Sequence, residues 1–237
     1  MTRKHTGRLR MAVARTPVKL AAALITVGLA VSACSTAQLG AAAITSGSRI
    51  SSATLTDQVA NLSTAYQTDN AKGIKPQRPA AQETQQVLTW LLLFRIYGQI
   101  AAQQHISPTP AQANAQLAGL SAQARQSKAT LGEYVSAAGA LPPDLVPQLG
   151  QYFAILATLE SRLNGGKPPT STTAQSQVQA GVAHAQCLAA KSLGVQVNPQ
   201  FGVFDYRTYS VVLAPSKLAA DRRPSPASGQ LVLNPPC

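Results

Sequence analysis

Residues 84–104 read TQQVLTWLLLFRIYGQIAAQQ, and this stretch decides the fold class. From Val87 to Tyr97 it is apolar on nearly every side of a helix, which is typical of a helix buried in a protein core or in a membrane. Arg95 interrupts the run, and a membrane span needs about 20 apolar residues in succession. The stretch therefore predicts a central helix from about Thr84 to Gln104, buried inside a folded domain.

Helix-start signals on both sides of this stretch predict further helices around it. Ser51 is a suitable N-cap for a preceding helix, and Thr109 followed by Pro110 is a typical start for the next one. Thr130 and Glu133 have the spacing of a capping box, which predicts a short helix at that point. These signals favour a mainly helical domain.

Two longer helices are expected in the second half of the chain. The first follows Leu141 and ends at the helix stop Asn164-Gly165-Gly166, and the second contains Cys187 and ends near Gly194. The core positions of the first helix are Leu145, Leu149, Tyr152, Phe153, Leu156, Leu159 and Leu163.

Short β-like runs are confined to two parts of the chain. Residues 41–45 and 49–50 flank a turn at 46–48, and residues 195–199 and 210–213 have strand character near the other end. Together with the helices, these runs predict one mainly α domain over residues 41–213. The residues from 214 to 237 form a Pro/Ser-rich tail.

The N-terminal residues have the layout of a secretory signal. Six basic residues precede the apolar run at 20–31, and small residues follow it. Residues 31–34, VSAC, resemble the lipobox of bacterial lipoproteins, in which the cysteine receives a diacylglyceryl group and the peptidase cuts before it. The resemblance implies a signal peptide at 1–33, lipidation of Cys34, and a tether at 34–40 that holds the domain on the extracytoplasmic face of the cell membrane.

Two other interpretations of this N-terminal segment stay open. An uncleaved membrane anchor needs about 20 apolar residues, whereas residues 20–33 provide 14. Cleavage by an ordinary signal peptidase is compatible with the same layout and would leave Cys34 as a free thiol.

The formal net charge of +12 overstates how basic the exported chain would be. Six of the 20 basic residues and none of the eight acidic ones lie in residues 1–33, which leaves 14 positive and 8 negative charges, a balance of +6. No basic stripe is interleaved with aromatic residues, and this argues against a nucleic-acid partner. Anionic lipid headgroups are a further contact that the lipid anchor itself would favour.

Cys187 and Cys237 form an even pair once Cys34 is lipidated, and export would place them in an oxidising compartment. At about 100° per residue, Cys187 points about 140° away from Val182, which lies on the apolar stripe of the same helix. This position suits a disulfide with a C-terminal tail laid across the helix. Two unpaired thiols and a frayed tail are the alternative.

An ordered set of segments between residues 40 and 213 resembles a known family. The segments are AAITSGSRIS (42–51), Val87-Leu88 with the central helix, HISPT (105–109), Leu131 with Glu133 and Tyr134, Leu141-Pro142 with the long helix, and LGVQVNPQFG (193–202). This set resembles the N-terminal domain of the SurA family of extracytoplasmic chaperones, in the short lipoprotein form seen in actinobacteria.

The resemblance implies a helical domain whose N- and C-terminal segments meet in a small antiparallel β-sheet. It also implies a chaperone, or holdase, that binds unfolded or exported polypeptides. Full-length relatives carry a parvulin prolyl-isomerase domain between the long helix and the final helix. Here that interval is the loop 164–173, which is far too short for a domain. We therefore expect no prolyl-isomerase activity.

The chain after the signal lacks the residue patterns of common enzyme sites. Its two histidines, His105 and His184, fall in different elements, and no HExxH, paired CxxC or G-x-S-x-G motif is present. The acidic residues are isolated, and Asp57, Glu133 and Asp144 suit helix N-termini. The sequence thus predicts no catalytic site, no metal and no cofactor.

An apolar groove between helices is the expected binding site, and Tyr97, Tyr152 and Phe153 are the candidates to line it. Periodicity alone does not separate a groove from a core at these positions. Two functions would use such a groove: a chaperone that holds many exported chains, and a structural or assembly lipoprotein with one dedicated protein partner. The breadth of binding is not encoded in the pattern, so both stay open.

Overall fold

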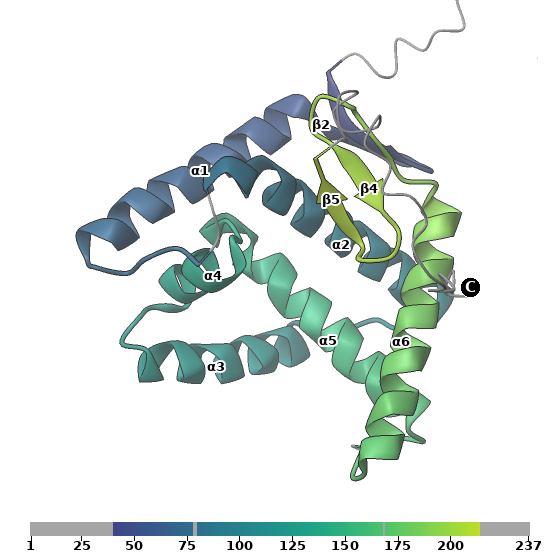
Figure 1. Ribbon diagram of the computed structural model, residues 1–237. Helices are drawn as coiled ribbons and strands as arrows, with labels where there is room; N and C mark the ends of the chain where they lie inside the picture. The colour runs from purple at the N-terminus through teal and green to yellow at the C-terminus, as the bar shows by residue number, and fades with distance from the viewer. Residues whose placement is uncertain (1–39, 78–79, 168, 214–237) are drawn as a thin grey trace, which may run out of the picture. The chain divides into compact units, whose positions relative to one another are not determined.

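The computed structural model describes residues 40–77, 80–167 and 169–213. Six α-helices and two small antiparallel sheets make up these residues, which confirms the prediction of a mainly α fold (Figure 1). The predicted signal peptide at 1–33 and tail at 214–237 lie outside the described residues, as does the tether except for its last residue.

The helices begin where the capping signals predict. Ser51 Oγ accepts a hydrogen bond from the backbone N–H of Thr54 at 2.9 Å, and Thr109 and Thr130 each complete a capping box. The elements are α1 (Ser52–Ala71), η2 (Ala80–Gln82), α2 (Glu83–Gln103), α3 (Pro110–Gln126), α4 (Leu131–Gly139), η3 (Pro143–Leu145), α5 (Val146–Leu163) and α6 (Thr172–Leu193).

Helix α2 is the centre of the core, as its apolar run predicts. It contacts α1, α5 and α6, and its residues Val87, Leu88, Leu92 and Ile96 are each 0 % exposed. Burying a side chain of this size stabilises a fold by roughly 1.5–3 kcal/mol, so α2 is a large part of what holds the domain together.

A three-stranded sheet joins the two ends of the described domain. The central strand β1 (Ala41–Thr45) pairs with β2 (Ser48–Ser51) on one side and with β3 (Gln196–Val197) on the other, and both pairings are antiparallel. Ala43 lies opposite Val197, so a segment that precedes α1 is paired with one that follows α6. The small antiparallel sheet between the N- and C-terminal segments is thereby confirmed.

A second sheet is a hairpin that packs on α2 (Figure 1). Its strands are β4 (Val203–Asp205) and β5 (Ser210–Val212), of which only β5 was predicted from the sequence. Two hydrogen bonds connect this region to α2. The Val211 N–H donates to Thr89 Oγ1 at 2.8 Å, and Gln85 Nε2 donates to the Phe201 carbonyl at 3.2 Å.

Helix α3 packs closely on α5 because α5 has a glycine at the contact. A Cβ added to Gly150 would lie 2.9 Å from Leu117 Cγ and 3.1 Å from the Ala113 carbonyl oxygen, both in α3. Such separations are too short for ordinary van der Waals contact. Gly150 therefore sets how near α3 lies to α5.

Gly150→Ala is expected to lower the free energy of unfolding by about 1 kcal/mol, because the overpacking exceeds the gain in helix propensity. Gly119→Ala is the matched control, since a Cβ at this α3 glycine would meet nothing within 4 Å. It should raise the free energy of unfolding by about 0.5–1 kcal/mol. Urea denaturation of the full chain measures both. Equal stabilisation by the two variants would contradict the close α3–α5 packing.

Candidate functional site

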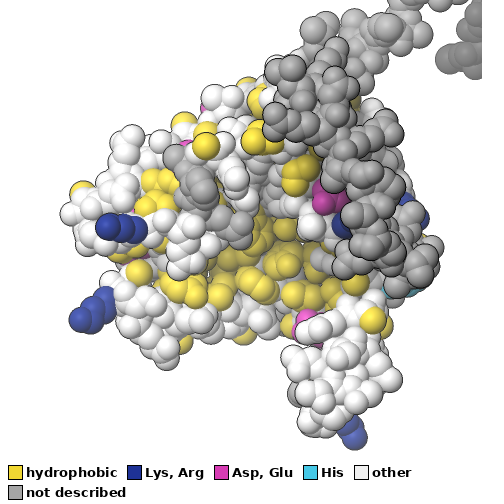
Figure 2. Space-filling model, viewed as in Figure 1, with side chains coloured by type: hydrophobic (Ala, Val, Ile, Leu, Met, Phe, Trp, Pro, Cys, Tyr) yellow, Lys and Arg dark blue, Asp and Glu magenta, His cyan; other side chains and the backbone are white. Residues whose placement is uncertain are grey.

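Helix α2 carries more apolar surface than its neighbours cover. The side chains of Trp90, Leu93 and Phe94 are only half-buried, although they belong to the apolar run that predicts complete burial. Figure 2 shows apolar side chains gathered in a band across the middle of one hollowed face. Partly exposed aromatic side chains in a hollow are typical of a binding surface.

A cavity of about 180 Å³ opens beside Trp90, between α2, α3, α4 and α5. This volume is smaller than the roughly 300–1,000 Å³ of clefts that hold drug-sized ligands, so its size suits a single apolar side chain. The residues that line it are Trp90, Leu120, Tyr134, Val135, Ala138, Gly139, Leu141, Leu149 and Phe153. We call this cavity, with the adjoining rings of Phe94 and Tyr152, the aromatic groove.

The rings of the aromatic groove are in contact with one another. Tyr152 is the hub, with ring centroids 6.2 Å from Trp90, 6.3 Å from Phe94 and 5.0 Å from Phe153. All three pairs are edge-on, the arrangement that the aromatic quadrupole favours. The edge-on contacts thus stabilise this arrangement of the rings around the cavity.

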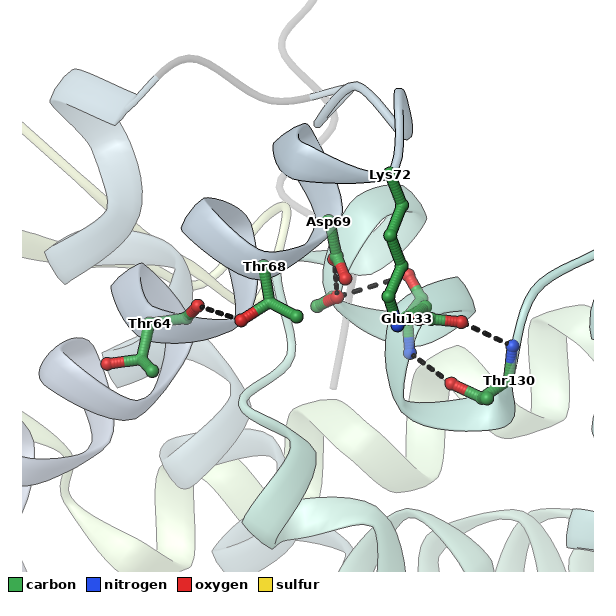
Figure 3. Close-up of polar contacts among 7 residues, drawn as sticks. Thr64, Thr68, Asp69, Lys72, Thr130 and Glu133 are labelled. Atoms are coloured by element: carbon green, nitrogen blue, oxygen red, sulfur yellow. Dashed lines mark hydrogen bonds and ion pairs between the residues drawn. The ribbon is translucent and has the colours of Figure 1, made fainter.

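Helix α4 forms one wall of the groove, and polar contacts hold it there. The indole N–H of Trp90 donates to the Gly139 carbonyl at 2.8 Å, which fixes the C-terminal end of α4 against α2. At the C-terminal end of α1, Asp69 Oδ2 accepts a hydrogen bond from Ser136 Oγ of α4 at 2.7 Å. Lys72, which follows α1, forms an ion pair with Glu133 of α4 (Figure 3).

The Glu133 carboxylate has two roles in this arrangement, as the ion-pair partner of Lys72 and as a member of the Thr130 capping box. The hydrogen bond from Lys72, followed by those from Thr130, lowers the pKa of Glu133 to about 2. A lowered pKa means that these contacts stabilise the fold at neutral pH, and that the contribution is lost as the pH falls from the ordinary range of glutamate toward about 2.

Two of the three predicted groove residues lie in the aromatic groove. Phe153 lines the cavity, and Tyr152 is the half-buried hub of the rings. The third, Tyr97, was also a candidate for the groove but does not line it. Its side chain is 1 % exposed, and its hydroxyl accepts a hydrogen bond from Gln186 Nε2 at 2.9 Å. Burial raises the pKa of the Tyr97 phenol, and the side chain belongs to the core.

The predicted lipidation site, Cys34, lies outside the described residues, and so does Cys237. Cys187 is 5 % exposed and takes part in a disulfide. Both cysteines that could be its partner lie outside the described residues, so the pairing with Cys237 stays a prediction. Cys187 is buried, although its helical position indicates that it points away from the apolar stripe.

Three aromatic residues of the groove were not predicted from the sequence to line it: Trp90, Phe94 and Tyr134. The first two stand four positions apart in the central run, a spacing that places both on one face of α2. That spacing could have identified Trp90 and Phe94 as a pair of aromatic residues on one helix face. Tyr134 had no such signal, because only the fold of α4 against α2 brings it to the cavity.

Three other cavities in the described residues lack aromatic rings. One of about 260 Å³ follows β1 and β3, one of about 290 Å³ lies between the first turns of α3 and α5, and one of about 550 Å³ lies beside Lys72 and Lys128. The largest of the three is lined by charged and polar side chains as well as Ile74 and Ala129. The aromatic groove is therefore the stronger candidate for apolar ligands.

No family model, curated protein or solved structure matches this chain. Within the described residues, no helix has both the length and the apolar character needed to cross a membrane. Nor do three or more His, Cys, Asp or Glu side chains gather there as ligands of a metal ion would.

Proposed function

We propose that this protein is a lipid-anchored extracytoplasmic chaperone that holds unfolded exported polypeptides by their apolar side chains. The observation that carries the proposal is the aromatic groove, in which half-buried rings surround a cavity the size of one side chain. An unfolded chain exposes such side chains at irregular intervals, and each insertion removes apolar surface from water. The groove would therefore bind many polypeptides without specificity for one sequence.

The anchor and the exported location rest on residues 31–34, with Cys34 as the acyl acceptor. Two or three acyl chains on one cysteine would hold the domain stably at the membrane surface, where a single chain binds only marginally. A chaperone held there would meet polypeptides as they leave the membrane.

The proposed mechanism is passive holding, without catalysis. The interval between α5 and α6 runs from residue 164 to 171, and its shortness supports a function without a prolyl-isomerase module. Binding would be reversible, and release would follow when the client buries its own apolar side chains.

Suppression of aggregation tests this function. The full chain, bound to phosphatidylcholine vesicles, should suppress aggregation of a chemically unfolded model client at a near-stoichiometric ratio without ATP. Phe153→Ser should weaken client binding about tenfold, because the burial of such a side chain contributes roughly 1.5 kcal/mol or more. Light scattering reports the aggregation.

The controls separate the groove from apolar surface in general. Val203 in β4 is 40 % exposed and lies outside the groove, so Val203→Ser should leave the suppression unchanged. Leu120→Ser is a second groove variant, and circular dichroism confirms that each variant is folded. Aggregation that proceeds unchanged at a several-fold molar excess of the wild type would reject the chaperone in favour of the single-partner assembly lipoprotein.

A further inference from the structure

One carboxylate lies on the same face of α5 as the groove residues. Glu160 follows Leu156 by four positions and Phe153 by seven, spacings that place all three on one side of a helix. Leu156 and Phe153 are half-buried, and so is Glu160. The apolar wall of α5 therefore ends in a negative charge about two turns beyond the cavity.

The surroundings of Glu160 place its charge near the rings of the groove. Burial raises the pKa of Tyr152, a hydrogen bond with Tyr97 opposes this rise, and the negative charge of Glu160 adds to it. Tyr97, next to Tyr152 at a ring separation of 4.3 Å, also feels this charge.

Glu160 has no cation of its own in the described residues. The ion pair found there joins Lys72, the residue that follows α1, to Glu133 in α4, and no hydrogen bond to the Glu160 side chain is present. A half-buried carboxylate next to apolar surface binds a cation more strongly than a fully solvated carboxylate does, because the local dielectric is lower.

We infer that Glu160 selects clients that carry a lysine or arginine close to the apolar side chain held in the aromatic groove. This inference rests on the proposed function and adds a preference to it. Seven residues of helix rise by about 10 Å, and about three residues of extended chain span the same distance. The favoured segment thus has an apolar residue and a basic residue about three positions apart.

Two matched peptides test the preference. Both are short, fluorescein-labelled and centred on one leucine. One has lysine about three positions from the leucine on each side, and the other has glutamine at those positions. The full-length wild type should bind the lysine peptide about three to five times more tightly in a fluorescence anisotropy titration, the range that partly exposed ion pairs provide.

Glu160→Gln should bring the ratio of the two dissociation constants close to one and leave the affinity for the glutamine peptide unchanged. Asp57→Asn is the control, since Asp57 is an exposed carboxylate on α1, away from the groove, and its loss should not alter the ratio. A ratio of one in the wild type, with both peptides bound, would overturn the preference and leave the proposed function intact. Failure of both peptides to bind would overturn the groove itself and this inference with it.

Discussion

Gly202→Ala is expected to lower the free energy of unfolding by roughly 3 kcal/mol, the largest single effect that we predict for this chain. Gly202 has a φ of +130°, a conformation that L side chains rarely adopt. An added Cβ would also collide with the Val212 carbonyl oxygen and lie 3.0 Å from Val211 Cγ1. Since both neighbours belong to β5 and Gly202 directly precedes β4, the two strands of the hairpin would have to move apart at this end.

Gly47→Ala separates backbone strain from the collision. Gly47 lies in the β1–β2 turn with a φ of +85°, and a Cβ there would meet nothing within 4 Å. Gly47→Ala should lower the free energy of unfolding by only about 1–2 kcal/mol. Urea denaturation of both variants measures the difference, and hydrogen exchange at the Val211 amide reports whether its bond to Thr89 persists. Equal decreases in the free energy of unfolding for the two variants would show that β5 makes no close steric contact at Gly202.

Ser136→Ala is expected to lower the free energy of unfolding by about 2 kcal/mol, since a hydrogen bond to a charged group contributes roughly 1.5–3 kcal/mol. Ser136 is 0 % exposed and Asp69 is 1 % exposed, so the carboxylate that loses this donor stays away from water. The contact connects α1 to α4, and its loss should loosen the wall of the groove as well.

The double variant Asp69→Leu with Ser136→Ala tests the cause of that loss. Replacing both partners by apolar groups removes the buried charge. The free energy of unfolding of the double variant should therefore exceed that of Ser136→Ala alone by at least about 1 kcal/mol. Thermal unfolding monitored by circular dichroism compares the three proteins. A double variant less stable than the single one would mean that Asp69 contributes through something other than this hydrogen bond.

The helices were predictable because their signals are local. The N-caps at Ser51, Thr109 and Thr130 place the starts of α1, α3 and α4 to the residue, and the left-handed Gly194 ends α6 where expected. Each signal acts within a few residues of the chain, so it needs no tertiary context.

Features that depend on distant contacts were not predictable in the same way. Strand β4 has three residues and exists because it pairs with β5, and the buried Asp69 has its partner 67 positions away in the chain. The groove is intermediate: the apolar run of α2 indicates burial, but only the packing of α3, α4 and α5 shows which side stays open. For that reason Tyr97 is core, while Trp90 and Phe153 line the groove.

The central claim is that apolar segments bind in the aromatic groove, and Trp90 reports on it directly. Trp90 is the one tryptophan of the chain, and it lines the cavity. A leucine-rich peptide without tryptophan, carrying a nitroxide next to the leucine, should quench Trp90 fluorescence saturably, with the same dissociation constant as fluorescence anisotropy gives. Binding by anisotropy without any quenching of Trp90 would place the peptide elsewhere and contradict the account.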